Sequence, residues 1–380
     1  MNKIITLPHS QKRSGCIFFV PDPEGEISGR PMANNRNLLA LKAVYKEVVV
    51  VTYKPPRLKT QNRWRRILQN LQQIFSPCSS DAYYELLEEV EKHPDYHVFF
   101  THSKFGVFVR NLKKKHPETF TSVFFHNVEL MMTLLRSKTS KSIIEFPIIL
   151  KYYISEKNIC KHADRVLVLN SRDGNLLKKI FGCQQDKLAE LPMSLVDRNT
   201  MFVEKTYDVR KWKILFVGTY AWFNIPGLKA FIQTVMTKDS DVAELYVVGF
   251  GLDKLGKELG PFHGVHYIGE VSQETLNEYY KNADIFVAPV TTGGGMKTKV
   301  AEAMMYGVPV VGTGEAFTGY DVDIAKMGFC SDDIPSYADF IRNVTPEQLK
   351  SMSDFSRQYY KQKYSLDTSI RILRKIYCNE

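Results

Sequence analysis

Short apolar runs recur through the first half of the chain and are separated by longer polar stretches with helical spacing. Runs of this length without polar alternation predict strands that are buried on both faces. The helical spacers between them predict crossover connections, and therefore a parallel, doubly wound sheet. The predicted strands are CIFFV (16–20), EVVVV (47–51), HVFF (97–100), SVFF (122–125) and RVLVL (165–169).

The same pattern starts again after a polar segment at residues 196–213 and predicts a second parallel sheet. In this half, Pro226 suits the first turn of a helix, and Ser272 suits the N-cap of a helix that ends near Ala283. The predicted strands are ILFVG (214–218), LYVVG (245–249), VHYIG (265–269), IFVAPV (285–290) and VPVVG (308–312).

Two α/β domains follow from this repetition, and a chain of 380 residues is long enough for both, because a domain usually has about 100–200 residues. We place the first domain at residues 1–205 and the second at 206–360. The last segment is helical with a break near Ser365. Residues 361–380 are therefore predicted to form a helix that closes the molecule or returns to the first domain.

The composition argues against a membrane-spanning protein, a secreted disulfide-rich protein and a zinc protein. The longest apolar stretch, residues 143–154, carries Glu145 and Lys151 and is too short to span a bilayer. The N-terminus lacks the apolar core of a signal peptide. The 6 cysteines are far apart without a CxxC pair, so neither a disulfide framework nor a zinc site is predicted. We expect a cytoplasmic protein.

Charge is distributed unevenly along the chain. Residues 1–205 hold 32 Lys and Arg against 20 Asp and Glu, whereas residues 206–380 hold 19 against 21. A basic half predicts contact with a polyanion, either a nucleic acid or an anionic membrane surface. The aromatic residues lie mostly in strand-like runs rather than among exposed cations, so a nucleic-acid partner is not expected.

One basic amphipathic helix is predicted at residues 61–75, where an apolar stripe follows helical spacing. It could lie on the inner face of an anionic membrane as a peripheral anchor, or it could pack on its own domain. The stripe consists of Trp64, Ile67, Leu68, Leu71, Ile74 and Phe75, and the cations near its start are Arg57, Lys59, Arg63, Arg65 and Arg66.

Residues 291–315, TTGGGMKTKVAEAMMYGVPVVGTGE, contain the strongest chemical signal. Three glycines follow a predicted strand and lead into a helix that starts near Lys297 and stops at Gly307. Glycine amides and the start of a helix favour a phosphate, and Lys297 and Lys299 add positive charge. A tight turn with an exposed Lys299–Glu302 pair is the alternative. Because GxxxxGK[ST] and GxGxxG are absent, kinases, ATPases and simple dinucleotide enzymes are disfavoured.

The segment GGGMKTKVAEAMMYGVPVVGT resembles the donor-site segment of retaining GT-B glycosyltransferases of the family-4 type. Further similar segments occur in the family's order and cover most of residues 97–320. The resemblance implies two Rossmann-like domains facing across a cleft, the first binding an acceptor and the second a nucleotide-sugar. The similar segments are FHNVE (125–129), ADRVLVLNSRDGNLLKKIFG (163–182), ILFVGTYAWFNIPGLKAFI (214–232), LYVVGFG (245–251) and GEVSQETLNEYYKNADIFVAPV (269–290).

The resemblance also implies roles for single residues. Glu302 is the ribose-binding carboxylate, the second glutamate of the family's E-x7-E pattern, but the first position of that pattern is Gly294. The Arg and Lys that many members carry after the first strand of the second domain are missing too. Lys297 and Lys299 would then neutralise the diphosphate, together with Arg30. The other implied contacts are Gly218, Thr219, Val271, Gly293, Gly295 and Met296 to the donor, with Gly29 and His126 from the first domain.

The implied reaction transfers a hexose-type sugar from a UDP- or GDP-linked donor to a saccharide, for instance a lipid-linked oligosaccharide. With retention, the leaving phosphate itself takes the acceptor proton, so no side-chain base is needed. An inverting enzyme would need a base, for which Asp22, Glu24 and His126 are the candidates. A catalytically silent partner subunit is the other alternative. No cofactor and no metal are expected, although DVD at residues 321–323 mimics a DxD metal motif.

Overall fold

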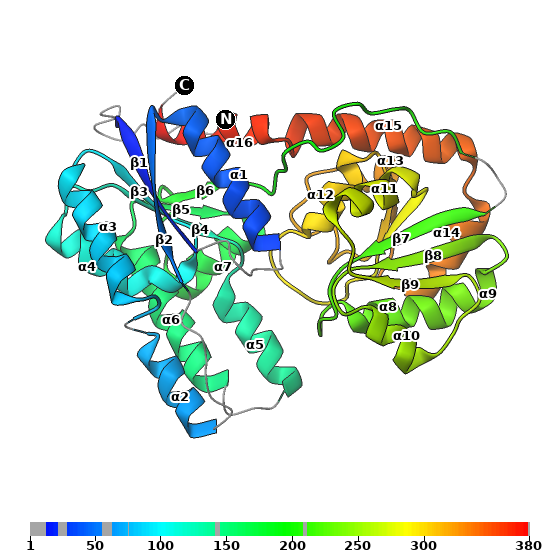
Figure 1. The fold of residues 1–380 in the computed structure, drawn as a ribbon, viewed down its shortest axis with the longest axis horizontal. Helices are drawn as coiled ribbons and strands as arrows, with labels where there is room; N and C mark the ends of the chain where they lie inside the picture. The colour runs from blue at the N-terminus through cyan, green and yellow to red at the C-terminus, as the bar shows by residue number, and fades with distance from the viewer. Residues whose placement is uncertain are drawn as a thin grey trace. The chain divides into compact units, whose positions relative to one another are not determined.

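The computed structural model describes residues 13–21, 29–54, 63–74, 76–140, 145–207 and 211–378. The chain forms two compact units (Figure 1). Unit 1 contains Met1–Pro192 together with Leu366–Glu380, and unit 2 contains Met193–Ser365. Each unit has one parallel six-stranded sheet, so the predicted α/β class is confirmed.

The sheet of unit 1 has the strand order β2-β1-β3-β4-β5-β6. All five predicted strands of this half are confirmed, and β6 is an additional one. Its three residues are at least partly exposed and contain no apolar run, so the hydrophobic pattern gave no signal for it. The strands are β1 Gly15–Pro21, β2 Glu47–Tyr53, β3 His97–Phe100, β4 Thr121–Phe125, β5 Arg165–Val168 and β6 Leu188–Glu190.

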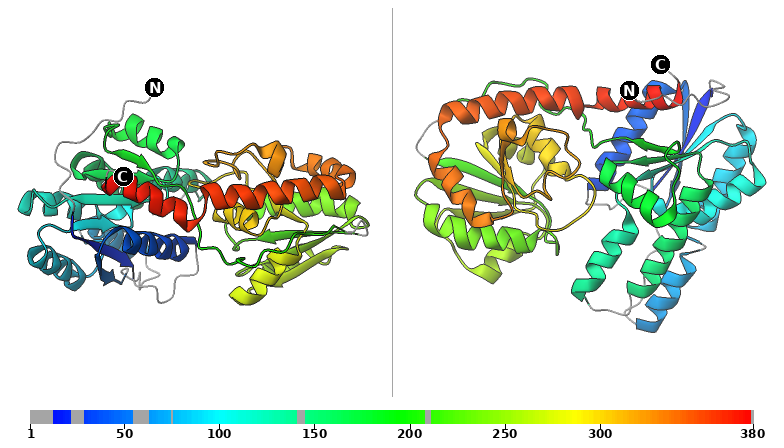
Figure 2. Two further views of the ribbon diagram at one scale, coloured as in Figure 1. Left: turned by 90° about the horizontal axis from the view of Figure 1, so that it is seen from above. Right: turned by 180° about the vertical axis from the view of Figure 1, so that it is seen from behind.

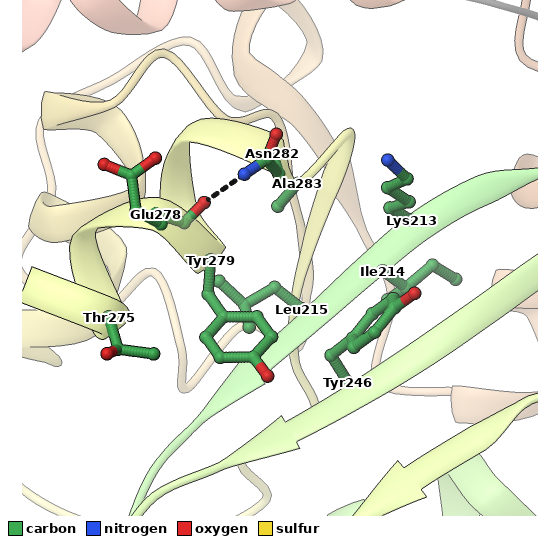
Figure 3. A pocket seen from close by; sticks show the side chains of 9 residues that line it. All are labelled: Lys213, Ile214, Leu215, Tyr246, Thr275, Glu278, Tyr279, Asn282 and Ala283. Carbon is green, nitrogen blue, oxygen red and sulfur yellow. Dashed lines mark hydrogen bonds between the residues drawn. The ribbon is translucent and has the colours of Figure 1, made fainter. Parts of the chain in front are cut away.

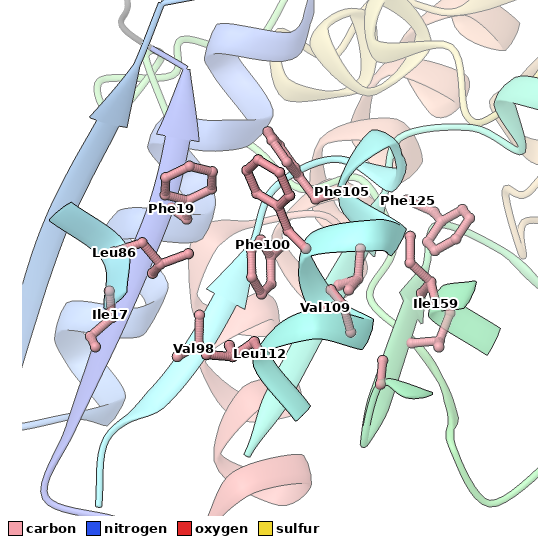
Figure 4. Packing of buried hydrophobic residues seen from close by; sticks show 14 of the residues in the cluster. Ile17, Phe19, Leu86, Val98, Phe100, Phe105, Val109, Leu112, Phe125 and Ile159 are labelled. Carbon is pink, nitrogen blue, oxygen red and sulfur yellow. The ribbon is translucent and has the colours of Figure 1, made fainter. Parts of the chain in front are cut away.

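Helices lie on both faces of this sheet, as Figure 2 shows from two further directions. On one face, the aromatic side chains of Phe19, Phe100 and Phe105 pack together under α3 and α4 (Figure 4). Burial on both faces explains why β1, β3, β4 and β5 are largely apolar, whereas the edge strand β2 is mostly exposed or half-buried. The helices are α1 Gly29–Val44, α2 Arg63–Gln72, α3 Ser80–Lys92, α4 Gly106–Lys115, α5 Glu129–Ser140, α6 Glu145–His162, α7 Ser171–Phe181 and α16 Leu366–Tyr377, with a short 3₁₀ turn at Ser103–Phe105.

The C-terminal helix α16 belongs to unit 1 and packs on α1. The guanidinium of Arg36, which is almost fully buried, donates hydrogen bonds to Ser369 Oγ at 2.8 Å and to the Pro192 carbonyl at 3.2 Å. Tyr377 donates to Ser122 Oγ at 2.9 Å. Of the two paths considered for the last segment, the chain takes the return to the first domain.

The sheet of unit 2 has the order β12-β11-β10-β7-β8-β9. The five predicted strands are again confirmed, and the three-residue strand β12 was not predicted. The strands are β7 Trp212–Val217, β8 Ala243–Val248, β9 Val265–Gly269, β10 Ile285–Ala288, β11 Val310–Gly312 and β12 Gly328–Cys330. The helices are α8 Ile225–Phe231, which continues through a π turn at Ile232–Met236 into α9 Thr237–Asp239, then α10 Asp253–Leu259, α11 Gln273–Asn282, α12 Thr298–Met305, α13 Ile324–Met327, α14 Tyr337–Asn343 and α15 Pro346–Lys363, with a 3₁₀ turn at Ile334–Ser336.

Local signals place several of these helix ends. Ser272 caps α11 by accepting a hydrogen bond from the Thr275 amide at 3.2 Å, and Pro226 lies in the first turn of α8, both as predicted. Helix α12 stops at Met305, and Gly307 follows with φ +62°, a left-handed conformation that suits glycine.

The units divide after Pro192 and Ser365, whereas the sequence pattern placed the divisions after residues 205 and 360. The segment at 193–207 has no apolar run that would assign it to either sheet. In the structure it is bound to unit 2, because Arg357 of α15 pairs with Asp197 at 2.7 Å and Lys205 donates to the Tyr280 carbonyl at 3.2 Å.

Candidate functional site

The predicted donor contacts gather at one edge of the unit 2 sheet. Because all its strands are parallel, their carboxyl ends lie at the same edge, where α/β proteins bind ligands. Gly218 and Thr219 directly follow β7, Val271 follows β9, and the glycine loop at residues 293–295 follows β10. The structure therefore brings these segments of the second domain to one edge of the sheet.

The glycine loop has little space for side chains. Gly295 has φ +59°, which favours glycine. A Cβ on Gly293 would lie 3.2 Å from Cε and 3.3 Å from Nζ of Lys297, because the lysine side chain passes directly over this glycine. Met296 is buried, and its sulfur accepts a hydrogen bond from the Met193 amide at 3.3 Å, so its side chain anchors the loop.

Lys297 is the last residue before α12, and its side chain is only 16% exposed. Its ammonium group contacts Glu315 Oε1 at 2.7 Å and the Gly294 carbonyl at 3.3 Å. The cation predicted for a diphosphate is thus already paired with a carboxylate. Glu315 was not predicted as a site residue, since no local motif connects it with a lysine 18 residues earlier.

Glu302 is completely buried in α12, and three side chains hold its carboxylate. Arg198 Nη2 lies 2.6 Å from Oε1, Lys299 Nζ lies 2.7 Å from Oε2, and the Tyr280 hydroxyl donates to Oε2 at 3.1 Å. Burial raises the pKa of this carboxyl, but Lys299 and Arg198 outweigh burial, so its net pKa is lowered. The Lys299–Glu302 pair exists, but it is not the exposed pair considered as the alternative.

Arg198 also reaches the first residue of α11. Its Nη1 donates to Gln273 Oε1 at 3.1 Å, two residues after the predicted contact Val271. Arg198 therefore bridges the start of α11 and Glu302, and the carboxylate has no exposed surface. A ribose hydroxyl can reach Glu302 only if one of the surrounding side chains moves. Arg198 was not predicted as a site residue, because this arginine lies in an irregular segment that contains no motif.

In unit 1, His126 lies at the end of β4 and is almost fully buried. The equally buried His102 follows β3, with the two ring centroids 6.2 Å apart. Nδ1 of His102 accepts a hydrogen bond from the Lys104 amide at 3.1 Å, and its Nε2 lies 3.9 Å from Glu129 Oε1. His126 was predicted from the family resemblance, whereas His102 was not predicted, although it too follows a predicted strand, HVFF.

Glu156 of α6 lies beneath this cluster and is fully buried. Its Oε1 accepts hydrogen bonds from the Glu129 amide at 2.8 Å and from Ser103 Oγ at 3.0 Å, and its Oε2 accepts one from the Leu130 amide at 3.4 Å. Burial raises the pKa of this carboxyl to about 8, despite these donors. Because it binds the first amides of α5, Glu156 fixes the turn that follows His126.

The remaining predicted residues of the first domain are described only in part. Gly29 and Arg30 begin α1, but the Arg30 side chain lies outside the described residues. Asp22 and Glu24, the candidates for a base in an inverting reaction, also lie outside them. Within the described ranges, no group of three His, Cys, Asp or Glu side chains could hold a metal ion, and Asp321 and Asp323 of the DVD sequence are exposed.

A separate pocket lies on one face of the unit 2 sheet, between α11 and the strands β7 and β8 (Figure 3). It has a volume of about 440 Å³, and none of the predicted donor contacts lines it. Its lining consists of Lys213, Ile214, Leu215, Tyr246, Thr275, Glu278, Tyr279, Asn282 and Ala283.

The sheet edge that carries the glycine loop lies in a region shared with known proteins. Residues 211–344, from β7 into α14, match the family described as "Glycosyl transferases group 1". This region, which we call the group 1 domain, is the part of the chain that is similar to the family. This domain contains the glycine loop, both lysines and Glu302, so the segment that indicated the family lies inside the matched region.

Two relatives extend the similarity beyond the group 1 domain. "Uncharacterized glycosyltransferase MJ1069" of Methanocaldococcus jannaschii is 24% identical over 256 residues, which are 61% of this chain and 64% of that protein. The match thus spans less than two thirds of that relative. "Uncharacterized 44.6 kDa protein in cps region" of Klebsiella pneumoniae is 20% identical over 304 residues, covering 77% of this chain and 71% of that protein.

Solved structures confirm the fold around the group 1 domain. HepE of Anabaena, solved in complex with UDP and glucose, has a TM-score of 0.67 at 12% identity and covers 96% of this chain and 100% of its own. Sucrose-phosphate synthase of Thermosynechococcus elongatus has a TM-score of 0.72 at 14% identity, with 96% and 98% covered. The predicted GT-B fold and the predicted relationship to glycosyltransferases are confirmed.

Proposed function

We propose that the protein transfers a hexose-type sugar from a nucleoside diphosphate to a saccharide acceptor, with retention of configuration. The observation that carries this proposal is the position of the glycine loop. The loop lies at the carboxyl edge of the unit 2 sheet, directly before α12, and Lys297 is fixed at its end. Backbone amides at a helix start and a fixed cation are suited to the charge that a departing diphosphate develops.

The nature of the donor is supported by solved relatives. HepE has been solved with UDP-glucose, and another structure with this fold is a lipopolysaccharide galactosyltransferase, WaaB. UDP-hexoses are therefore the first donors to test, with GDP-hexoses beside them. WaaB is named for the lipopolysaccharide outer core, and we propose a saccharide acceptor of a similar kind, such as a lipid-linked saccharide. Arg30 and His126 of unit 1 remain proposed contributors to the transfer.

A panel of nucleotide-sugars tests this function. Wild-type protein should show a rise in melting temperature with one nucleotide series and should slowly hydrolyse the matching sugar donor. Lys297→Ala should lower kcat/KM by about 10²–10³-fold, because one preorganised cation at the leaving group is lost. Lys326→Ala is the control. It removes an exposed lysine of unit 2 whose described ion pair is with the neighbouring, also exposed Asp323.

Other outcomes separate the alternatives. If no nucleotide changes the melting temperature, the proposal fails and the silent partner subunit is favoured. If the sugar of the product has the opposite anomeric configuration by NMR, the transfer inverts, and retention is wrong.

We also propose that unit 1 docks on an anionic membrane through the start of α2. Trp64 and Leu68, one helical turn apart, are 74% and 60% exposed, whereas Ile74 is buried. The apolar stripe is therefore only partly covered by its own domain. No helix among the described residues is long and apolar enough to cross a bilayer, so this contact would be peripheral.

Helix α6 adds to the same end of unit 1. It packs beside α2, and Figures 1 and 2 show the first turns of both helices at one end of the unit. Phe146, in the first turn of α6, is 67% exposed. Exposed positive charge comes from Arg65 of α2 and from Lys138 near the end of α5. Exposed aromatic residues among cations suit an anionic headgroup region.

Liposome flotation tests this contact. Wild-type protein should float with vesicles that contain phosphatidylglycerol and much less with phosphatidylcholine alone. A Trp64→Ser, Leu68→Ser double variant should lose at least about half of the bound fraction, because each apolar side chain contributes about 1.5–3 kcal/mol when buried. Tyr84→Ser, at a residue of α3 that is 62% exposed, is the control. Equal, negligible flotation with both lipids would remove the idea.

A further inference from the structure

Glu315 is a carboxylate that the proposed function does not use, although it lies in the glycine loop's immediate surroundings. Its Oε1 is 2.7 Å from the Lys297 ammonium and 3.5 Å from the position that a Cβ on Gly293 would take. Its side chain keeps 20% of its surface exposed. The structure thus brings a carboxylate from elsewhere in the chain to a loop that has none of its own.

The turn after β11 fixes this position. Thr313 accepts a hydrogen bond from the Ala316 amide through its carbonyl at 3.0 Å and donates through its hydroxyl to the Val290 carbonyl, at the end of the β10 segment. Ala316 and Phe317 are buried and anchor the residues directly after Glu315. The carboxylate is therefore carried by a turn that is tied to the glycine loop on one side and to the core on the other.

A purely structural ion pair explains this arrangement poorly. The two side chains are only 16% and 20% exposed, and for a largely buried ion pair the loss of hydration offsets much of the attraction, so stability alone is a weak reason for it. At the same time, a negative charge 2.7 Å from Lys297 weakens the positive potential that a diphosphate needs. A loop that served only to bind phosphate would do better without Glu315, so the carboxylate has to be useful to another part of the ligand.

That other part is the sugar, which is bonded to the phosphate that Lys297 is proposed to bind. A carboxylate is a pure acceptor and suits the hydroxyl donors of a sugar ring. Hydrogen bonds to an ionised acceptor are also about twice as strong as those between neutral groups. A carboxylate in contact with the phosphate-binding ammonium is within a few ångströms of a sugar attached to that phosphate.

We propose that Glu315 binds hydroxyl groups of the transferred sugar and determines which sugar is accepted. This inference rests on the proposed nucleotide-sugar function. It also gives the donor site a carboxylate despite Gly294, the position at which the E-x7-E pattern has its first glutamate. Pairing with Lys297 orients the carboxylate, and burial of Ala316 and Phe317 limits its movement.

Calorimetric binding of two probes to each variant separates the sugar from the nucleotide. UDP and UDP-glucose are measured with wild-type protein and with Glu315→Gln, which keeps the shape of the side chain. We expect UDP to bind within about threefold of wild type, or more tightly, since Lys297 keeps its charge. UDP-glucose should lose at least tenfold in affinity, and the preference between UDP-glucose and UDP-galactose should shrink. GDP and GDP-mannose replace these probes if the panel selects guanine.

Two controls define the outcomes. Asp323→Asn removes an exposed carboxylate of unit 2 and should change neither affinity, whereas Lys297→Ala should weaken both probes together. If Glu315→Gln weakens UDP and UDP-glucose equally, the residue only positions Lys297, and the inference is wrong. No change with either probe would reduce the contact to a structural ion pair. Absence of any nucleotide binding by wild-type protein would end the proposed function and this inference with it.

Discussion

Gly227→Ala should prevent unit 2 from folding into a stable structure. Gly227 lies in α8, and a Cβ at this position would come within 1.5 Å of the Pro289 carbonyl oxygen and 2.7 Å of its carbon. These are backbone atoms of the residue directly after β10, so no flexible side chain can turn away. Relief requires α8 to separate from the strand that leads into the glycine loop. We expect a loss of more than about 4 kcal/mol, a large part of the 5–15 kcal/mol of a typical domain.

Gly174→Ala is the matched control. Gly174 lies inside α7, and its Cβ would meet nothing closer than Val168 Cγ2 at 3.6 Å, an ordinary contact. Alanine should be tolerated there or should stabilise the helix by about 0.5–1 kcal/mol. Soluble yield and thermal unfolding followed by circular dichroism compare the two variants. A Gly227→Ala protein that melts within a few degrees of wild type would show that α8 can shift without disturbing the sheet.

Glu302→Gln should destabilise unit 2 by about 3–5 kcal/mol at neutral pH and abolish nucleotide binding. The substitution keeps the size of the side chain but removes the negative charge between Arg198 and Lys299, whose side chains are only 22% and 34% exposed. Leaving a buried pair without one partner typically has this cost. Lys299 is more exposed than Arg198, so solvent screens part of its interaction with Glu302. We therefore expect a loss near the lower end of this range.

The pH dependence of this effect follows from the lowered pKa of Glu302. Burial raises the pKa of Glu302, but Lys299 and Arg198 together lower it by more. The folded protein therefore binds this proton less tightly than the unfolded chain. The stabilisation is therefore present above the ordinary glutamate pKa of about 4.3 and is lost as the pH falls through the folded value. Urea unfolding should show a smaller difference between wild type and Glu302→Gln at pH 3.5 than at pH 7.

Glu278→Gln provides the comparison for this experiment. Glu278 pairs with Lys281 at the surface, with side chains 60% and 47% exposed, and its loss should change stability by less than about 0.5 kcal/mol. A Glu302→Gln variant as stable as Glu278→Gln at pH 7 would mean that the network around Glu302 does not stabilise the unit.

The sequence predicted the fold well because burial on both faces makes the inner strands of each sheet nearly continuous apolar runs, as in β3 and β10. The two strands that it did not predict, β6 and β12, have three residues each and are not fully buried, so they lack that pattern. The first division between the units was placed after residue 205 rather than after residue 192 for a related reason. Residues 193–207 are irregular, and only the tertiary contacts of Asp197 and Lys205 assign them to unit 2.

Only those residues of the site that lie close together in the sequence could be predicted. The glycine loop, Lys297, Lys299 and Glu302 lie within ten residues and have a recognisable pattern. Arg198 and Glu315 reach the same groups from 104 and 18 residues away, and no spacing rule connects such residues. For the same reason the sequence indicated two cations ready for a phosphate, whereas the structure shows each of them paired with a carboxylate.

The return of α16 to unit 1 has a consequence for how the protein is made. Residues 366–377 are synthesised after the whole of unit 2, yet Arg36 of α1 is buried against Ser369 and has its pKa lowered by that burial to about 9. The sheet of unit 1 is therefore synthesised first, but unit 1 can be completed by α16 only after all of unit 2 has been synthesised. A fragment cut at the boundary after Pro192 would lack α16 and leave the Arg36 side chain exposed, so a single cut cannot separate the two units of this protein.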